Sequence, residues 1–387
     1  MQDSCAKLAA QMALAGCCFA IQGCVSDSVV SACAPVDAAP AATSAAISST
    51  LAGIKDKYKL NAIVFGAEQD GKPLYRAALG VSTNGVPATT DMHFRIGGVG
   101  WQVLSTILLR MVEQEPARIA LTDRVSRWYP DYPKADLATV RMLAASSTGF
   151  GDYINAGTFI QELVANPLRV WTADDLIARS VPPYQTPQKF EPGQGWNYSH
   201  TDFVMLGAVL EKVSGRKYAD LLQALVLDPL GLRNTRFQLD AAPQLPVLHT
   251  LQEEDFRDST YWNPSFVSWA ALTSDICDLG TWTRAFGTGS LLSPAMRSEI
   301  VAPVNVGLGG NTAQGYFGLG TLVYPPWIVQ RAAYWGMYTT TAYDPTTGTS
   351  LAVTISLSPA SPPNVQPANE IVTEISKLLM PDHPVPR

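Results

Sequence analysis

The chain has 387 residues, of which 47% are hydrophobic and 16% charged, and its formal net charge is −6. This length is enough to bury a substantial core, as one large domain or as two. Lysine and arginine are nowhere clustered, and binding to nucleic-acid phosphates depends on clustered cations. We therefore expect no nucleic-acid partner.

The N-terminal segment predicts export. Lys7 precedes the uncharged stretch "LAAQMALAGCCFAIQGC", which is too short and too broken for a membrane span. Within it, "LAGC" ends at Cys17 and resembles a bacterial lipobox, and Cys24 and Cys33 are alternative lipidation sites. Acyl chains on such a cysteine would anchor the protein to a membrane surface. A signal region over 1–33 thus predicts a lipoprotein or a secreted protein of the bacterial cell envelope.

Five of the six cysteines lie in this same region, and Cys277 is the only one in the rest of the chain. If the first 33 residues are a signal, no disulfide is expected in the folded part, and Cys277 is expected to be a small buried apolar residue. The Pro/Ala-rich segment 34–45 predicts a linker that separates the domain from the membrane.

The rest of the chain divides into recognisable elements. A helix is expected from Ser48 or Ser49, followed over 61–80 by two strands that turn at Asp70 and Gly71. Apolar residues at helical spacing predict a helix from residue 98 to about 115. Helices and loops follow to about residue 285, then strand-like runs over 316–324, 334–345 and 350–358, and a final amphipathic helix over 371–379.

This order predicts an α/β (α+β) fold. Strands from both ends of the sequence would form one antiparallel sheet, flanked by the terminal helices, as a lobe made of 46–97 and 286–387. Residues 98–285 would form a large, mainly helical lobe of the same domain, 46–387. A small-molecule site is expected at the junction of the two lobes.

Several segments carry a family resemblance: "FRIGGVG", "TVRMLAASSTGF", "FEPGQGWNYSHTDFVMLGAVLEKVSG", "LDPLGLRNT" and "AYDPTTG". In order and spacing they resemble the serine β-lactamase and penicillin-binding (DD-peptidase) family, and its class C and esterase-like branch in particular. The resemblance extends from about residue 46 to the end. It implies the fold described above and, in the family, hydrolysis of esters, amides or D-Ala-D-Ala peptides, with no metal and no cofactor.

The resemblance also implies where the catalytic motifs lie. The family's S-x-x-K motif, whose serine attacks a carbonyl while the lysine takes its proton, aligns with Gly98 to Trp101. Glycine has no nucleophile, and an indole cannot accept a proton. The second motif, Y-x-N, aligns with Tyr198, Ser199 and His200, so only its tyrosine is kept. The motifs therefore indicate that the serine–lysine chemistry has been lost.

The third motif, K/H-x-G, aligns with Tyr334, Trp335 and Gly336, of which only the glycine is kept. In the family the oxyanion hole consists of backbone N–H groups, which the alignment assigns here to Gly98 and Met337. Backbone donors do not depend on side-chain identity, and a helix N-terminus favours negative charge. A carbonyl or carboxylate group is therefore still expected to bind.

Some roles stay open. Trp101, Tyr198 and Trp335 either line an aromatic cleft, or Trp101 fills the volume left by a lost lysine. His200 is a base or a structural histidine, and Ser147 and Ser199 are weaker candidates for a relocated nucleophile. Asp152 and Tyr153 are expected at the cleft rim. The remaining histidines, His93, His249 and His383, show no metal-like spacing, so we expect no metal site.

The leading hypothesis is an exported, non-catalytic protein that binds or scaffolds a small envelope molecule or a peptidoglycan-like ligand. The alternative is an active serine-type hydrolase that uses a relocated nucleophile or His200 as base. A third hypothesis, a purely structural protein, predicts a cleft plugged by Trp101 and Trp335. The sequence leaves the oligomeric state open.

Overall fold

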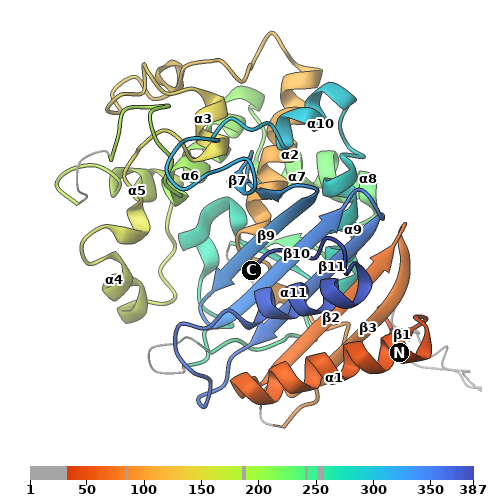
Figure 1. The fold of residues 1–387 in the computed structure, drawn as a ribbon. Helices are drawn as coiled ribbons and strands as arrows, with labels where there is room; N and C mark the ends of the chain where they lie inside the picture. Colours follow the sequence, from red (N-terminus) through yellow and green to blue (C-terminus); the bar gives the residue numbers. More distant parts are fainter. Residues whose placement is uncertain (1–32, 84, 185–188, 240–242, 252–256) are drawn as a thin grey trace, which may run out of the picture. The chain divides into compact units, whose positions relative to one another are not determined.

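The computed structural model describes residues 33–387 except 84, 185–188, 240–242 and 252–256. One compact unit spans Cys33–Arg387. At its centre lies an eight-stranded sheet in the order β1-β3-β2-β11-β10-β9-β8-β7, in which neighbouring strands are antiparallel (Figure 1). The predicted antiparallel sheet, built from both ends of the sequence, is confirmed.

The strands of this sheet are β1 (Val36–Asp37), β2 (Ala62–Gln69), β3 (Lys72–Gly80), β7 (Tyr316–Phe317), β8 (Leu322–Tyr324), β9 (Trp327–Tyr334), β10 (Met337–Asp344) and β11 (Thr349–Ser356). A small second sheet, in the order β4-β6-β5, consists of β4 (Phe94–Arg95), β5 (Arg236–Phe237) and β6 (Leu272–Ser274). It lies where the chain leaves the first strands and enters the helical lobe.

Two tight turns set the register of the large sheet. Asp70 and Gly71 join β2 to β3 with φ values of 50° and 76°, and Trp335 and Gly336 join β9 to β10 with φ values of 44° and 86°. Two consecutive residues with positive φ are the signature of the two-residue turn that matches strand twist. The first turn was predicted from Asp70-Gly71, whereas the second falls inside a run that the sequence analysis treated as one strand.

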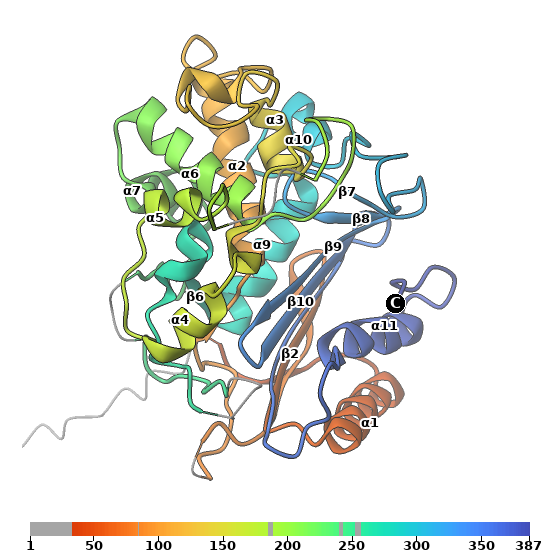
Figure 2. The same ribbon diagram turned by 90° about the vertical axis from the view of Figure 1, so that its left-hand side faces the viewer.

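Terminal helices cover one face of the sheet, as predicted (Figure 2). α1 (Ala41–Tyr58) and α11 (Pro367–Leu379) pack against each other and against the sheet. Their apolar stripes, with Ile47 and Leu51 on one helix and Ile371 and Ile375 on the other, join strand residues in one buried cluster. Burying these stripes against the sheet stabilises both elements.

The other face of the sheet carries α9 (Ile276–Thr288) and, beyond it, the helical lobe (Figures 1 and 2). The other helices of this lobe are α2 (Val99–Gln114), α3 (Val140–Ala145), α4 (Phe159–Ala165), α5 (Ala173–Ala178), α6 (His200–Ser214), α7 (Tyr218–Leu222), α8 (Asp228–Leu230) and α10 (Pro294–Ile300), with a π-helical turn over Gln223–Leu227 and 3₁₀ turns over Val125–Arg127, Tyr153–Asn155 and Pro264–Ala270. α2 is buried along most of its length. It therefore forms the centre of the lobe and directs its N-terminus toward the sheet.

The N-terminal boundary of the domain differs from the prediction. The expected linker, 34–45, is part of the fold, because Val36 and Asp37 pair with β3 and α1 begins at Ala41 rather than near Ser48. Proline precedes this helix at Pro40, without a side-chain cap, so the serines at 48 and 49, which predicted the start as N-cap residues, were misleading. Among the described helices, none is both long and apolar enough to cross a membrane.

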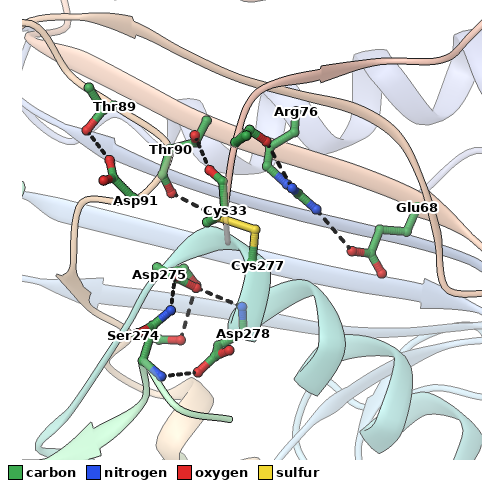
Figure 3. The surroundings of a disulfide bond; sticks show 12 residues. Cys33, Glu68, Arg76, Thr89, Thr90, Asp91, Ser274, Asp275, Cys277 and Asp278 are labelled. Carbon is green, nitrogen blue, oxygen red and sulfur yellow. Dashed lines mark hydrogen bonds and ion pairs between the residues drawn. A yellow bond between two sulfur atoms is a disulfide. The ribbon is translucent and has the colours of Figure 1, made fainter. Parts of the chain in front are cut away.

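A disulfide ties this boundary to the centre of the molecule. Cys33 is bonded to Cys277, in the first turn of α9, across 244 residues of sequence (Figure 3). The expectation of no disulfide was therefore wrong, and so was that of Cys277 as a simple apolar residue. Assigning Cys33 to the signal region concealed that β1 follows it at once and places it beside α9. Because its sulfur is bonded, Cys33 is also excluded as a lipidation site, while Cys17, Cys24 and the predicted signal lie outside the described residues.

Candidate functional site

A cavity of about 380 Å³ lies where α2 begins, between the helical lobe and the edge of the large sheet. It is lined by Gly97, Gly98, Trp101, Trp196, Tyr198, His200, Val267, Ala270, Phe317, Leu322, Gln330, Arg331, Ala332 and Ala333. We call it the cleft. A larger cavity, of about 560 Å³, lies beside α7, α8 and β5 but contains none of the motif residues. Two of the predicted motifs thus meet at the predicted junction, and the cleft is not plugged as a purely structural protein would require.

Gly97 and Gly98 precede α2, and only Gly97 makes a close approach to β9. Gly97 has a φ of 49°, and a Cβ there would lie 3.3 Å from both Ala332 Cβ and the Ala333 carbonyl oxygen, so the close approach favours glycine. Gly98 differs, because its φ is −59° and a Cβ there would lie 3.5 Å or more from Trp101 and 3.7 Å from Tyr198 Oη. Packing therefore does not require glycine at position 98, and the cleft has room for a small side chain there.

Trp101 combines the two roles that the sequence left open. Its indole is 1% exposed and stacks on Phe203 at 4.7 Å between ring centroids, yet it also lines the cleft. Its only polar atom is engaged, since Nε1–H donates a hydrogen bond of 2.6 Å to Tyr198 Oη. Trp101 is thus a core residue that also holds the tyrosine of the second motif.

Tyr198 keeps its proton in this setting. Burial raises the pKa of its phenol, and the weaker opposing effect comes from the Trp101 hydrogen bond. Because the indole can only donate, Tyr198 accepts that bond and its own O–H stays available to donate to another acceptor. A neutral phenol of this kind is a hydrogen-bond donor for a ligand and a poor base.

Gln330 links α2 to β9. Its Nε2 donates to the carbonyl oxygens of Gly98 at 3.0 Å and Gly320 at 2.8 Å, and its Oε1 accepts from the backbone N–H of Arg331. One uncharged side chain thereby fixes β9 against the start of the helix. Gln330 was not predicted as a site residue, although the β-branched and aromatic run that begins at Trp327, after two prolines, is a strand signal.

The predicted third motif does not line the cleft. Tyr334 ends β9 and packs on Phe266 with ring centroids 5.5 Å apart, while Trp335 occupies the turn and packs on Trp262 at 5.3 Å. Gly336 completes that turn. The strand segment beside Gly98 is instead Gln330–Ala333, so the alignment of this motif was four residues too late.

Because the third motif lies earlier on the strand than expected, the second backbone donor of the oxyanion hole also differs from the predicted one. Met337 opens β10 and faces Tyr334 across the two-residue turn, where the flanking residues bond to each other. In an antiparallel ladder the next residue along, Ala333, then directs its N–H away from β10, toward the cleft that it lines. The backbone donors that the fold brings together are therefore those of Gly98 and Ala333, and Met337 is excluded.

His200 lies in the cleft as half of a pair that the sequence did not reveal. Its Nδ1 is 3.0 Å from Asp152 Oδ2, and its ring meets Tyr198 edge-on at 5.0 Å. Asp152 is buried and also caps the short 3₁₀ turn that follows it, while His200 is the first residue of α6. Where the carboxylate oxygen accepts this bond, Nδ1–H is its donor, and Nε2 is the acceptor of a ring in that tautomer.

The two alternative serines are placed away from the cleft. Ser147 is buried just after α3, without the preceding strand that a nucleophile elbow requires, and Ser199 is buried at the N-terminus of α6. Tyr153 is also fully buried, where its hydroxyl donates to the Phe266 carbonyl, rather than at the rim as expected. Neither Ser147 nor Ser199 is among the residues that line the cleft.

Possible metal ligands gather at one place in the described part of the chain. Cys33, Asp275 and Cys277 bring their ligand atoms within 4.8 Å of one another, but both sulfurs are used in the disulfide. His249 and His383 each lie beside a carboxylate, Asp258 and Asp344 respectively. These pairs are ordinary charge-assisted contacts outside the cleft.

Comparison with known proteins identifies the family. A family model described as Beta-lactamase matches residues 47–372. The chain belongs to the β-lactamase family. Among curated relatives, penicillin-binding protein 4* of Bacillus subtilis is 30% identical over 47% of this chain and 39% of that protein. Esterase EstB of Burkholderia gladioli is 33% identical over 45% of this chain and 46% of that protein. The chain thus spans less than half the length of either relative.

Solved structures resemble more of the β-lactamase-family chain. A D-stereospecific amidohydrolase from Streptomyces sp. superimposes with a TM-score of 0.71 and 25% identity, over 81% of this chain and 94% of that one. A D-amino acid amidase from Ochrobactrum anthropi superimposes with a TM-score of 0.73 and 20% identity, over 87% of this chain and all of that one. These similarities confirm the β-lactamase/transpeptidase-like fold.

Proposed function

We propose that this β-lactamase-family protein binds a carbonyl-bearing ligand in its cleft without forming a covalent acyl-enzyme. The observation that carries the proposal is the bond from Trp101 Nε1–H to Tyr198 Oη. At the positions that the resemblance assigns to nucleophile and base, the chain has Gly98 and this engaged indole. Nothing at either position can attack a carbonyl or take a proton.

The cleft offers a ligand donors and aromatic surface. The N–H groups of Gly98 and Ala333 and the hydroxyl of Tyr198 are suited to a carbonyl oxygen, and the N-terminus of α2 adds a partial positive charge. Trp196 and Phe317, with ring centroids 5.6 Å apart, form an apolar wall. Esters, amides and short peptidoglycan-like peptides carry the matching groups, and the names of the relatives refer to proteins that act on such compounds.

Location in the cell envelope is part of the same proposal. Disulfides persist in oxidising compartments, and the Cys33–Cys277 bond is consistent with export. The lipobox-like stretch ending at Cys17, or the weaker one at Cys24, would supply a lipid anchor. Radiolabelled palmitate incorporation in a bacterial host, compared between Cys17→Ala and Cys24→Ala variants, tests the anchor separately from the cleft.

A chemical probe tests the cleft. We expect no mass increase of the intact protein with a fluorophosphonate or a labelled penicillin, and reversible binding of N-acyl-D-Ala-D-Ala detected by NMR. Tyr198→Phe, which removes only the hydroxyl, should weaken this binding by about five- to tenfold, as expected for one hydrogen bond. A stoichiometric adduct that disappears with a single Ser→Ala change would refute the proposal.

One observation favours a second candidate, in which the protein hydrolyses its ligand by activating water. Asp152 orients His200 as a carboxylate orients a general base, and His200 lines the same cleft as Gly98 and Ala333. This function predicts turnover of p-nitrophenyl esters that falls at least 100-fold in His200→Gln and Asp152→Asn. His249→Gln is the matched control, because His249 has an equivalent contact with Asp258, at 2.6 Å, outside the cleft.

A further inference from the structure

A second, smaller cavity lies behind one wall of the cleft. Its volume is about 210 Å³, room for roughly seven water-sized groups. It is lined by Phe286, Gly287, Arg297, Ile300, Val301, Tyr316, Val323, Pro325, Pro326, Ile328 and Pro345. Most of these side chains are apolar, so water in this cavity has few partners and an apolar ligand group would displace it favourably.

The two cavities share the β7–β8 ribbon as a wall. Tyr316 pairs directly with Val323, and both line the small cavity, whereas the next pair, Phe317 and Leu322, lines the cleft. This follows from strand geometry, because cross-strand partners share a face and successive residues alternate between faces. On β9, Ile328, which pairs with Val323, lines the small cavity, and Gln330 lines the cleft. These two residues are two positions apart and share a face, so along this strand the two cavities lie one after the other.

Among the described residues that line the small cavity, Arg297 is the only charged one. Its stem lies against Gly289, where a Cβ would come within 2.5 Å of Arg297 Cγ, and its Nη2 donates at 3.4 Å to the Gly287 carbonyl. Within the described residues, no carboxylate forms an ion pair with it. A single guanidinium at the mouth of an apolar cavity is complementary to an anion that carries an apolar tail.

We propose that this cavity binds a small amphiphilic carboxylate, with the tail among the apolar side chains and the carboxylate on Arg297, and that binding shifts the β7–β8 wall of the cleft. A ligand that fills the Tyr316–Val323 face would push on the outermost two strands of the sheet, which join β9 only through the short strand β8. The opposite face of that ribbon carries Phe317, which packs on Trp196 and Tyr198 with ring centroids 5.6 and 6.0 Å apart. The site is thus a regulatory one, and it does not depend on whether the cleft binds or hydrolyses its ligand.

Binding is tested with octanoate and with octan-1-ol, which has the same tail without the charge. We expect Arg297→Gln to weaken octanoate binding about fivefold in NMR titration, the size of one exposed ion pair, and to leave octanol binding unchanged. Arg297→Lys, which keeps the charge, should retain most of the affinity. Val301→Trp, which places an indole at the cavity mouth, should abolish binding of both. Equal affinities of wild type and Arg297→Gln for octanoate would overturn the assignment of the carboxylate to Arg297.

Coupling is tested through the indole N–H resonances of the cleft, assigned with Trp196→Phe and Trp101→Phe variants. Octanoate should shift the Trp196 resonance in the wild type and not in Val301→Trp, while Trp171, packed beside α4, should not move in either. If octanoate binds and leaves the Trp196 resonance unshifted, the small cavity is a binding site without influence on the cleft. If octanoate shifts Trp196 equally in Val301→Trp, it binds in the cleft itself, and the proposal is wrong.

Discussion

Gly98→Ser is the most direct perturbation of the cleft. A Cβ at this position lies 3.5 Å from Trp101 Cδ1 and 3.7 Å from Tyr198 Oη, so the serine fits without moving a neighbour. Its hydroxyl would meet a tyrosine whose pKa is raised by burial and an indole that cannot accept a proton. We therefore expect a folded, unreactive protein despite the restored nucleophile.

The magnitude follows from how such groups act together. In serine hydrolases, removing either nucleophile or base alone costs about as much as removing both, on the order of a millionfold in turnover, or about 8 kcal/mol of barrier. A serine at position 98 without a base beside it should therefore recover almost none of that turnover. Gly98→Ser with Trp101→Lys should be the first variant with detectable acylation. It carries a cost, because replacing a buried indole removes about 3–5 kcal/mol of packing.

The assay is intact-protein mass spectrometry after incubation with p-nitrophenyl butyrate and with penicillin, supported by thermal melts of each variant. Gly98→Ala is the matched control, since it adds the same Cβ without the hydroxyl. Stoichiometric acylation of Gly98→Ser alone, absent in Gly98→Ala, would refute the reasoning. Such a result would mean that His200 already serves as a base for this position.

Other predictions concern stability. Cys33→Ser or Cys277→Ser should lower the free energy of unfolding by about 2–4 kcal/mol, because the bond closes a loop across 244 residues. A reductant should lower the melting temperature of the wild type to that of either variant. The same reductant should leave the melting temperatures of the variants unchanged. Gln330→Ala leaves the carbonyls of Gly98 and Gly320 without the amide donor of Gln330. It should lower the free energy of unfolding by about 1–3 kcal/mol and weaken ligand binding in the cleft. The control Gln194→Ala, at an exposed position, should change neither the melting temperature nor the affinity measured by titration. Burial, and then the charge of Asp275, raise the pKa of Asp278 to about 6. Since the folded state holds this proton more tightly than the unfolded state, the free energy of unfolding should fall as pH rises from about 4 to about 6. Urea unfolding at several pH values measures this fall, and an equal fall in Asp278→Asn would contradict the assignment to Asp278.

Local patterns of sequence were sufficient for much of the fold. The buried stripe of α2, the Asp70-Gly71 turn and the apolar face of α11 are each encoded within one continuous segment of the chain. The start of β9 was missed because its run contains Gln330 and Arg331, which interrupt the apolar pattern, and follows two prolines. That omission moved the third motif by four residues and led to Met337 in place of Ala333.

The rest of the candidate site depends on contacts between distant residues. Asp152 and His200 are 48 residues apart, and their contact arises because a 3₁₀ turn and α6 begin side by side. Cys33 and Cys277 are further apart still, and a cysteine next to a signal-like segment gives no indication of a partner in a later helix. The periodicity of apolar residues predicts which face of a helix or strand is buried. It does not predict which other helix or strand packs against that face.

The positions that depart from the family pattern support one another structurally. Trp101 occupies the core against Phe203 and holds Tyr198 in place, while Gln330 ties Gly98 to β9 without a cation. The backbone donors of Gly98 and Ala333 are therefore positioned by packing and neutral hydrogen bonds, independently of any nucleophile. If this is correct, Gly98→Ser should leave ligand affinity and stability nearly unchanged, whereas Gln330→Ala should lower both. The opposite ranking of these two variants would mean that the cleft is organised by position 98, as in an enzyme, rather than by its supports.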